Sequence, residues 1–206
     1  AEATGLASDF TLTRLEKLLA ARATWPFDIP VSVNLSARDI LSTQVMEKIS
    51  ALVDRSGIAP RYIEFEITET AMFTDPLQAH RNLHALAARG HTIAMDDFGT
   101  GYSNFNYLRT LPIRKLKIDR SFMLNPGELA TEAIARSMVD MSKALDMICV
   151  VEGVETSAQL RLADRIGARI VQGFLVSRPI GADEFALRYQ LETGTDDSTI
   201  SRSAIG

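Results

Sequence analysis

Short apolar runs alternate along this chain with longer stretches that have the spacing of amphipathic helices. Six runs have strand character, at residues 31–33, 62–67, 92–95, 115–118, 148–151 and 168–171. The intervening segments place apolar residues on one helical face, and one of them opens with Thr74-Asp75-Pro76, an N-cap followed by proline. This alternation predicts βαβ units and a parallel sheet, and strands as apolar as 148–151 suit a sheet covered on both faces.

Each of the six runs ends in polar residues. In chain order these are Asn34, Glu66, the pair Asp96-Asp97, Lys117, Glu152 and Gln172. Because the carboxyl ends of parallel strands face one rim, these side chains are expected around a single mouth. A doubly wound sheet would concentrate ligands at one switch point, whereas a (β/α) barrel uses every strand end and fits the pattern better.

Five of these residues offer hard oxygen donors. Asn34, Glu66, Asp96, Asp97 and Glu152 form the kind of ligand set that Mg²⁺ or Mn²⁺ requires. The adjacent aspartates can reach one site only if the strand ends there, and the segment Phe98-Gly99-Thr100-Gly101 supplies that ending. Two ions bridged by one carboxylate would suit phosphoester hydrolysis. For any one acid taken alone, a solvated surface position or a helix cap remains the alternative.

Lys117 lies within an apolar run, between Leu116 and Ile118. A lysine is costly to bury without a partner, and the acidic cluster would provide one. There it could orient the attacking water or neutralise a phosphate oxygen. The alternative is an ion pair within the neighbouring charged segment, at Asp119 and Arg120.

Several functional classes find no support. The 206 residues carry a net charge of −4, which argues against a DNA or RNA partner bound through its phosphates. A P-loop and a nucleophile elbow are missing from the sequence.

Cys149 is expected to be a buried, inert thiol, and His80, His84 and His91 are expected at the surface. No apolar run is long enough to span a bilayer, and residues 1–6 do not resemble a secretory signal.

Six sequence motifs together resemble one known family. They are Val33-Asn34-Leu35-Ser36, Glu66-Ile67-Thr68-Glu69, the segment 96–103 (DDFGTGYS), Leu116-Lys117-Ile118-Asp119, Glu152-Gly153-Val154-Glu155-Thr156, and Gln172-Gly173-Phe174 followed by Ser177-Arg178-Pro179. In this order and at this spacing they resemble the EAL-domain family, the bacterial cyclic di-GMP phosphodiesterases. The resemblance runs from Ala1 to about Leu187 and implies a (β/α)₈ barrel of the TIM type.

The resemblance also implies a role for each motif residue. Two Mg²⁺ or Mn²⁺ ions would be held by Asn34, Glu66, Asp96, Asp97 and Glu152. Lys117, Glu152, Glu69 and Glu155 would act in catalysis, with Lys117 positioning the attacking water. Glu69 would steady the loop after Asp97, and Glu155 would order the nearby contacts. Gln172 and Asp119 would bind the substrate, cyclic di-GMP, which would be hydrolysed to linear pGpG.

The family also has two earlier strands, which carry a Gln-Pro motif and the Glu-Ala-Leu signature, and this chain opens after them. We therefore expect six of the eight barrel strands, a partial domain over residues 1–191 and a disordered tail or linker over 192–206. Upstream sensory or diguanylate-cyclase-like domains, a cytoplasmic location and a possible homodimer are further expectations, with membrane anchoring of the parent protein left open. A non-catalytic module that binds cyclic di-GMP or a protein partner is the alternative function, and an inactive structural remnant is a third.

Overall fold

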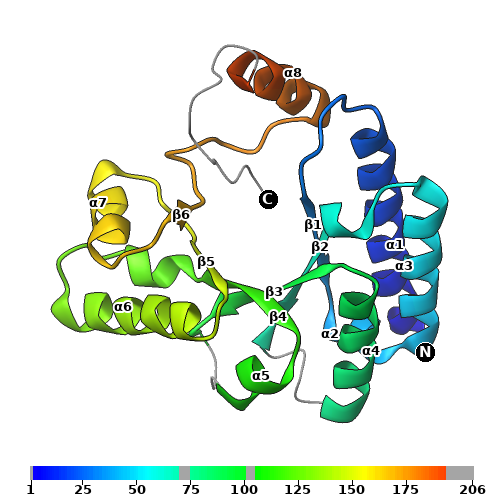
Figure 1. Cartoon of the computed structure of the whole chain (residues 1–206), viewed down its shortest axis with the longest axis horizontal. Coiled ribbons are helices and arrows are strands. Elements are labelled where there is room, and N and C mark those ends of the chain that lie inside the picture. Colours follow the sequence, from blue (N-terminus) through cyan, green and yellow to red (C-terminus); the bar gives the residue numbers. More distant parts are fainter. Residues whose placement is uncertain (1, 70–74, 101–104, 194–206) are drawn as a thin grey trace.

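A computed structural model describes residues 2–69, 75–100 and 105–193, and its centre is a single parallel sheet (Figure 1). The strands are β1 (Val31–Leu35), β2 (Ile63–Thr68), β3 (Thr92–Phe98), β4 (Ile113–Ile118), β5 (Ile148–Val151) and β6 (Ile170–Val171). They pair in chain order, β1-β2-β3-β4-β5-β6, and every pairing is parallel. The expectation of six strands in a parallel α/β fold is confirmed.

Helices connect these strands and surround the sheet. They are α1 (Glu2–Ala23), α2 (Ala37–Leu41), α3 (Thr43–Ser56), α4 (Pro76–Ala88), α5 (Phe105–Thr110), α6 (Leu129–Ala144), α7 (Ser157–Arg165) and α8 (Ala182–Thr193), with short 3₁₀ turns η1 (Pro60–Tyr62) and η3 (Arg120–Met123). In Figure 1 most of them lie on the outer side of the curved sheet. This arrangement leaves the carboxyl ends of the strands together at one rim.

The two faces of the sheet have opposite chemistry, because successive side chains of a strand point to opposite faces. One set of alternate residues is apolar and buried beneath the helices: Val33, Leu35, Phe65, Ile67, Ile93, Met95, Leu116 and Ile118. The other set is largely polar and includes Ser32, Asn34, Glu64, Glu66, Asp96, Lys115 and Lys117. The polar set is also buried in the middle of the sheet, because Glu64, Glu66 and Lys117 are only 4%, 6% and 5% exposed.

Local signals in the sequence account for several helix boundaries. The side chain of Asp75 accepts a hydrogen bond from the backbone N–H of Gln78 at 3.0 Å, and Pro76 is the first residue of α4, as expected. Helix α7 begins with a capping box between Thr156 and Gln159. It ends at Arg165, and Gly167 follows with φ +81°, the left-handed conformation expected of a helix stop.

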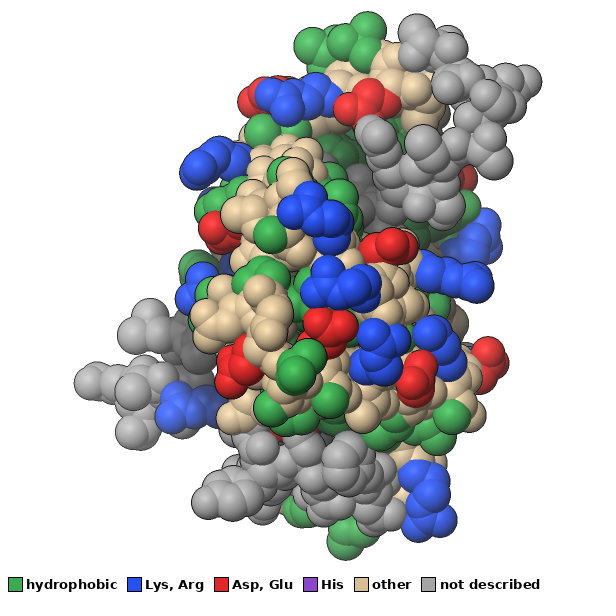
Figure 2. Space-filling model, turned by 90° about the vertical axis from the view of Figure 1, so that its left-hand side faces the viewer, with side chains coloured by type: hydrophobic (Ala, Val, Ile, Leu, Met, Phe, Trp, Pro, Cys, Tyr) green, Lys and Arg blue, Asp and Glu red, His purple; other side chains and the backbone are tan. Residues whose placement is uncertain are grey.

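The surface on the side of α6 and α7 carries basic and acidic side chains interspersed with one another (Figure 2). Glu132 of α6 pairs there with Arg165 of α7 at 3.0 Å and with Arg136 at 3.4 Å. In the described residues, no helix is both long and apolar enough to cross a membrane. Helix α8 extends to Thr193, so the first two residues of the expected tail are helical, and 194–206 lie outside the described residues.

The structure tests the expected positions of the three histidines and of Cys149. His80 and His84 are exposed, but His91 is only 4% exposed, so its expected surface position is wrong. The imidazole of His91 packs edge-on against Phe65 and its Nδ1 lies 3.2 Å from the carbonyl oxygen of Ile63. Cys149 is partly buried, and burial raises the pKa of its thiol, in keeping with the expected inert role.

Candidate active site

Lys117 lies at the centre of the candidate site. Its ammonium is 2.9 Å from Glu66, 2.9 Å from Asp96 and 2.8 Å from Glu152. The three carboxylates come from β2, from β3 and from the residue after β5, so this lysine on β4 links four neighbouring segments of the sheet. Lys117 is 5% exposed. Its ion pairs are with the acidic cluster rather than with the neighbouring charged segment at Asp119 and Arg120.

Asp96 and Asp97 reach the same place because β3 is irregular at its carboxyl end. Met95 pairs with Leu116 but Phe98 pairs with Ile118, so β3 has one more residue than β4 across this step. Asp97 takes up the extra residue with φ +51°, in the left-handed region. The strand was expected to stop before Phe98, but it continues, and the bulge rather than a strand end brings the two aspartates together.

Carboxylate oxygens of Asp96, Asp97 and Glu152 lie within 4.8 Å of one another, which is close enough to share a cation. Asp96 Oδ1 is buried and, in the part of the chain that is described, has no partner with hydrogen-bond geometry, although Lys117 stands 2.9 Å away. A group of converging hard oxygen donors suits a divalent ion such as Mg²⁺ or Mn²⁺.

Burial and ion pairing shift the pKa values of the site residues in opposite directions. Burial raises the pKa of Glu152, and the nearby Lys117 only partly offsets this effect. Burial and the neighbouring carboxylate of Asp96 raise the pKa of Asp97. Burial alone would lower the pKa of Lys117, but the charges of Glu66 and Glu152 outweigh it, so the pKa lies above the usual range and the side chain stays an ammonium.

The other residues expected at the site lie around this cluster. Asn34 is exposed on β1, in register with Glu66. Asp119 follows β4, caps η3 by accepting a hydrogen bond from the N–H of Ser121 at 2.9 Å, and is close enough to Asp97 to raise the pKa of that carboxyl.

Three further candidates lie near the ends of β2, β5 and β6. Glu69 is buried at the end of β2, and the loop it was expected to steady includes residues 101–104, which lie outside the described residues. Glu155 is exposed just before α7. Gln172 follows β6 and is held through its backbone by Val151 and Val154, at 2.8 and 3.0 Å.

A second charged layer, formed by Lys115 and Glu64, lies on the same polar face, two residues nearer to the amino ends of β4 and β2. Lys115 pairs with Glu64 at 2.6 Å, and Ser32 donates a hydrogen bond to Glu64 at 3.1 Å. The sequence interpretation missed this layer. The sequence does contain a signal for it. Residues two apart on a strand point to the same face, so Glu64 must share a face with Glu66 on β2, and Lys115 with Lys117 on β4.

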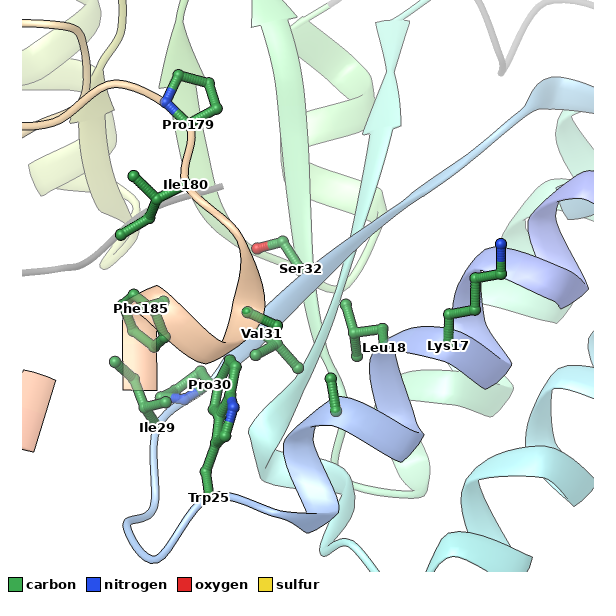
Figure 3. Close-up of a pocket in the computed structure, with 12 residues that line it drawn as sticks. Lys17, Leu18, Trp25, Ile29, Pro30, Val31, Ser32, Pro179, Ile180 and Phe185 are labelled. Atoms are coloured by element: carbon green, nitrogen blue, oxygen red, sulfur yellow. The ribbon is translucent and has the colours of Figure 1, made fainter. Parts of the chain in front are cut away.

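The two described cavities lie away from the acidic cluster. One, of about 450 Å³, runs beside β1 and is walled by Leu18 of α1, by Trp25 and Ile29, and by Phe185 of α8 (Figure 3). The other, of about 340 Å³, includes His91 and Pro112 near the amino ends of β3 and β4. Neither contains an acidic lining residue, so the cavities do not compete with the strand-end cluster as the place for metal chemistry.

Comparison with known proteins agrees with the geometry. The family model "EAL domain" matches residues 1–179. The chain is 34% identical over 166 residues to the cyclic di-GMP phosphodiesterase NbdA of Pseudomonas aeruginosa, with 79% of this chain and 21% of that protein covered. It is 36% identical over 178 residues to the probable cyclic di-GMP phosphodiesterase PdeA of Escherichia coli, with 84% and 24% covered.

A solved structure, the PaMucR phosphodiesterase in complex with c-di-GMP, superimposes with a TM-score of 0.83 at 33% identity, covering 90% of this chain and 77% of that one. The chain spans about a quarter or less of the length of these curated relatives. The family match over most of the sequence and the close structural similarity lead to one conclusion: this chain belongs to the EAL domain family.

Proposed function

We propose that this chain forms the catalytic part of a phosphodiesterase that hydrolyses one of the two phosphodiester bonds of cyclic di-GMP, giving linear pGpG. The observation that carries the proposal is the convergence of Asp96, Asp97 and Glu152 around Lys117 at the carboxyl ends of parallel strands. The names of the relatives NbdA and PdeA support the choice of substrate.

Two divalent ions, Mg²⁺ or Mn²⁺, would be held by the oxygen donors of the site, namely Asn34, Glu66, Asp96, Asp97 and Glu152. When bound, such ions activate a water molecule and reduce the negative charge on the phosphate. The excess of carboxylates over cations in the described cluster supports this assignment, because the acids repel one another until a cation is shared between them.

The protein's own residues would then orient the reactants. The ammonium of Lys117 is fixed by three carboxylates and would hold the attacking water through its N–H groups. Gln172 and Asp119 would contact the substrate near the acidic cluster. Glu155 and Glu69 would keep the adjoining loops in place. We further propose attachment to upstream signalling domains, a cytoplasmic location and a homodimeric state.

The test begins with the purified chain, incubated with cyclic di-GMP and Mn²⁺, and follows linear pGpG by chromatography. An extended version that adds the Glu-Ala-Leu segment is assayed beside it, and we expect the extended version to be the faster of the two. Absence of pGpG from both would contradict the proposed activity. Tight binding of cyclic di-GMP without turnover would instead favour the non-catalytic binding module.

Asp96→Asn tests the metal site directly. In the wild-type chain, millimolar Mn²⁺ should raise the thermal midpoint, because an ion that binds only the folded state stabilises it. Asp96→Asn should remove most of that rise and most of the activity, while Asp164→Asn, an exposed change on α7, should leave both intact. The metal site is contradicted if Mn²⁺ shifts none of the three proteins.

A further inference from the structure

The ammonium of Lys117 lies among the acids of the cluster. Lys117 has three carboxylate neighbours within 2.9 Å of its ammonium nitrogen and donates a hydrogen bond to Glu66. These neighbours come from different strands, so a single cation holds β2, β3 and the end of β5 against β4. Removing that charge would leave three largely buried carboxylates without their shared partner.

Two of the same carboxylates belong to the group suited to a divalent ion. Asp96 and Glu152 contact Lys117 and also lie within 4.8 Å of Asp97. An ion bound by this group would therefore share ligands with the ammonium at short range. Two positive charges that share ligands in a partly buried site repel each other, and each weakens the other's hold on the acids.

We propose that Lys117 serves as a built-in counter-cation that holds the unloaded site together and competes with divalent ions for Asp96 and Glu152. This inference rests on the metal site of the proposed function and adds a role for Lys117 distinct from positioning water. The competition sets how tightly the site binds metal, because part of the carboxylate charge is already neutralised before an ion arrives.

The chain contains a matched control for this role. Lys115 lies two residues earlier on β4 and points to the same face, where it pairs with Glu64 at 2.6 Å. Glu64 does not belong to the group formed by Asp96, Asp97 and Glu152. Loss of Lys115 should therefore lower stability without changing the affinity for metal.

The experiment compares Lys117→Met and Lys115→Met with the wild-type chain. Thermal unfolding is followed in EDTA and in Mn²⁺, and Mn²⁺ affinity is measured by calorimetry. In EDTA both variants should melt lower, Lys117→Met by on the order of 10 °C, because a buried ion pair has lost one partner. Lys117→Met should bind Mn²⁺ about tenfold more tightly and gain a larger thermal shift from it, whereas Lys115→Met should keep the wild-type affinity.

The outcomes separate this inference from the proposed function. A folded Lys117→Met variant with wild-type or weaker Mn²⁺ affinity overturns the inference alone, provided that the wild type binds Mn²⁺. Absence of Mn²⁺ binding in every protein overturns the metal site as well. If Lys117→Met fails to fold in EDTA, Lys117→Gln replaces it for the affinity comparison, and a Met variant that folds once Mn²⁺ is added supports the competition.

Discussion

His91 shows how one buried side chain can make stability depend on pH. Burial lowers the pKa of its imidazole, and the nearby charge of Arg89 adds to the effect, so the folded protein favours the neutral ring. The unfolded chain takes up a proton near pH 6.5, its ordinary pKa. The stability that comes from the neutral ring is therefore complete above pH 6.5 and is lost as the pH falls from there toward the lowered pKa of the fold.

We predict that urea denaturation of the wild-type chain will show a loss of stability between pH 7.5 and 5.5 that His91→Gln reduces. One proton limits the contribution to about 1.4 kcal/mol per pH unit. His80→Gln, a change at an exposed histidine, should leave the slope unaltered. Equal slopes for the wild type and His91→Gln would remove His91 as the source of the pH dependence.

At the scale of single residues, the sequence was most informative where a charge interrupts an apolar run. Lys117 and Glu66 stand out in this way, and both are buried in the cluster. His91 gave no such signal, because its burial depends on Phe65 and the backbone of β2, which are distant in the sequence. A buried imidazole with a backbone partner looks, in sequence, like a surface histidine.

At the scale of one element, the bulge of β3 is the feature on which the acidic cluster depends. Asp97 has φ +51°, a conformation that costs a residue with a side chain about 1–2 kcal/mol and a β-branched residue most. We predict that Asp97→Val destabilises the metal-free chain by about that amount, while Asp97→Gly leaves it as stable as the wild type or more so. Both variants should lose part of the thermal shift produced by Mn²⁺.

Asp146 provides the comparison, because it has φ +55° at the end of α6, outside the acidic cluster. Asp146→Val should cost similar stability but leave the Mn²⁺ shift unchanged. These measurements separate the effect of the left-handed backbone at Asp97 on stability from the contribution of its carboxylate to Mn²⁺ binding. If Asp97→Gly keeps the full Mn²⁺ shift, Asp97 is not a ligand.

Whole elements were more predictable than their boundaries. The six apolar runs predicted the strands in the right order, because burying one face of a strand requires apolar residues at alternate positions. The sequence did not predict the extra residue in β3, since a bulge is defined by the register with β4 rather than by local composition. The second charged layer on the polar face was also missed, although the charges of Glu64 and Lys115 were visible in the sequence.

At the scale of the whole molecule, the sheet has two ends in the described residues, at β1 and β6. β6 comprises only Ile170 and Val171, whereas β1 has five residues and pairs only with β2. An unpaired strand edge presents free backbone N–H and C=O groups to other chains. The apolar cavity of about 450 Å³ beside β1, lined by residues such as Trp25 and Phe185, adds surface that favours burial.

We predict that the chain self-associates through β1 at tens of micromolar, as a shift to larger species in sedimentation velocity with rising concentration. Val31→Lys should reduce the association, because a lysine at an edge strand puts a charge where a second strand would pair. Ile148→Lys adds the same charge at an exposed position on β5, which is paired on both sides, and should leave association unchanged. A wild-type chain that stays monomeric over this range, or equal association of all three proteins, would show that the β1 edge does not drive contact between copies.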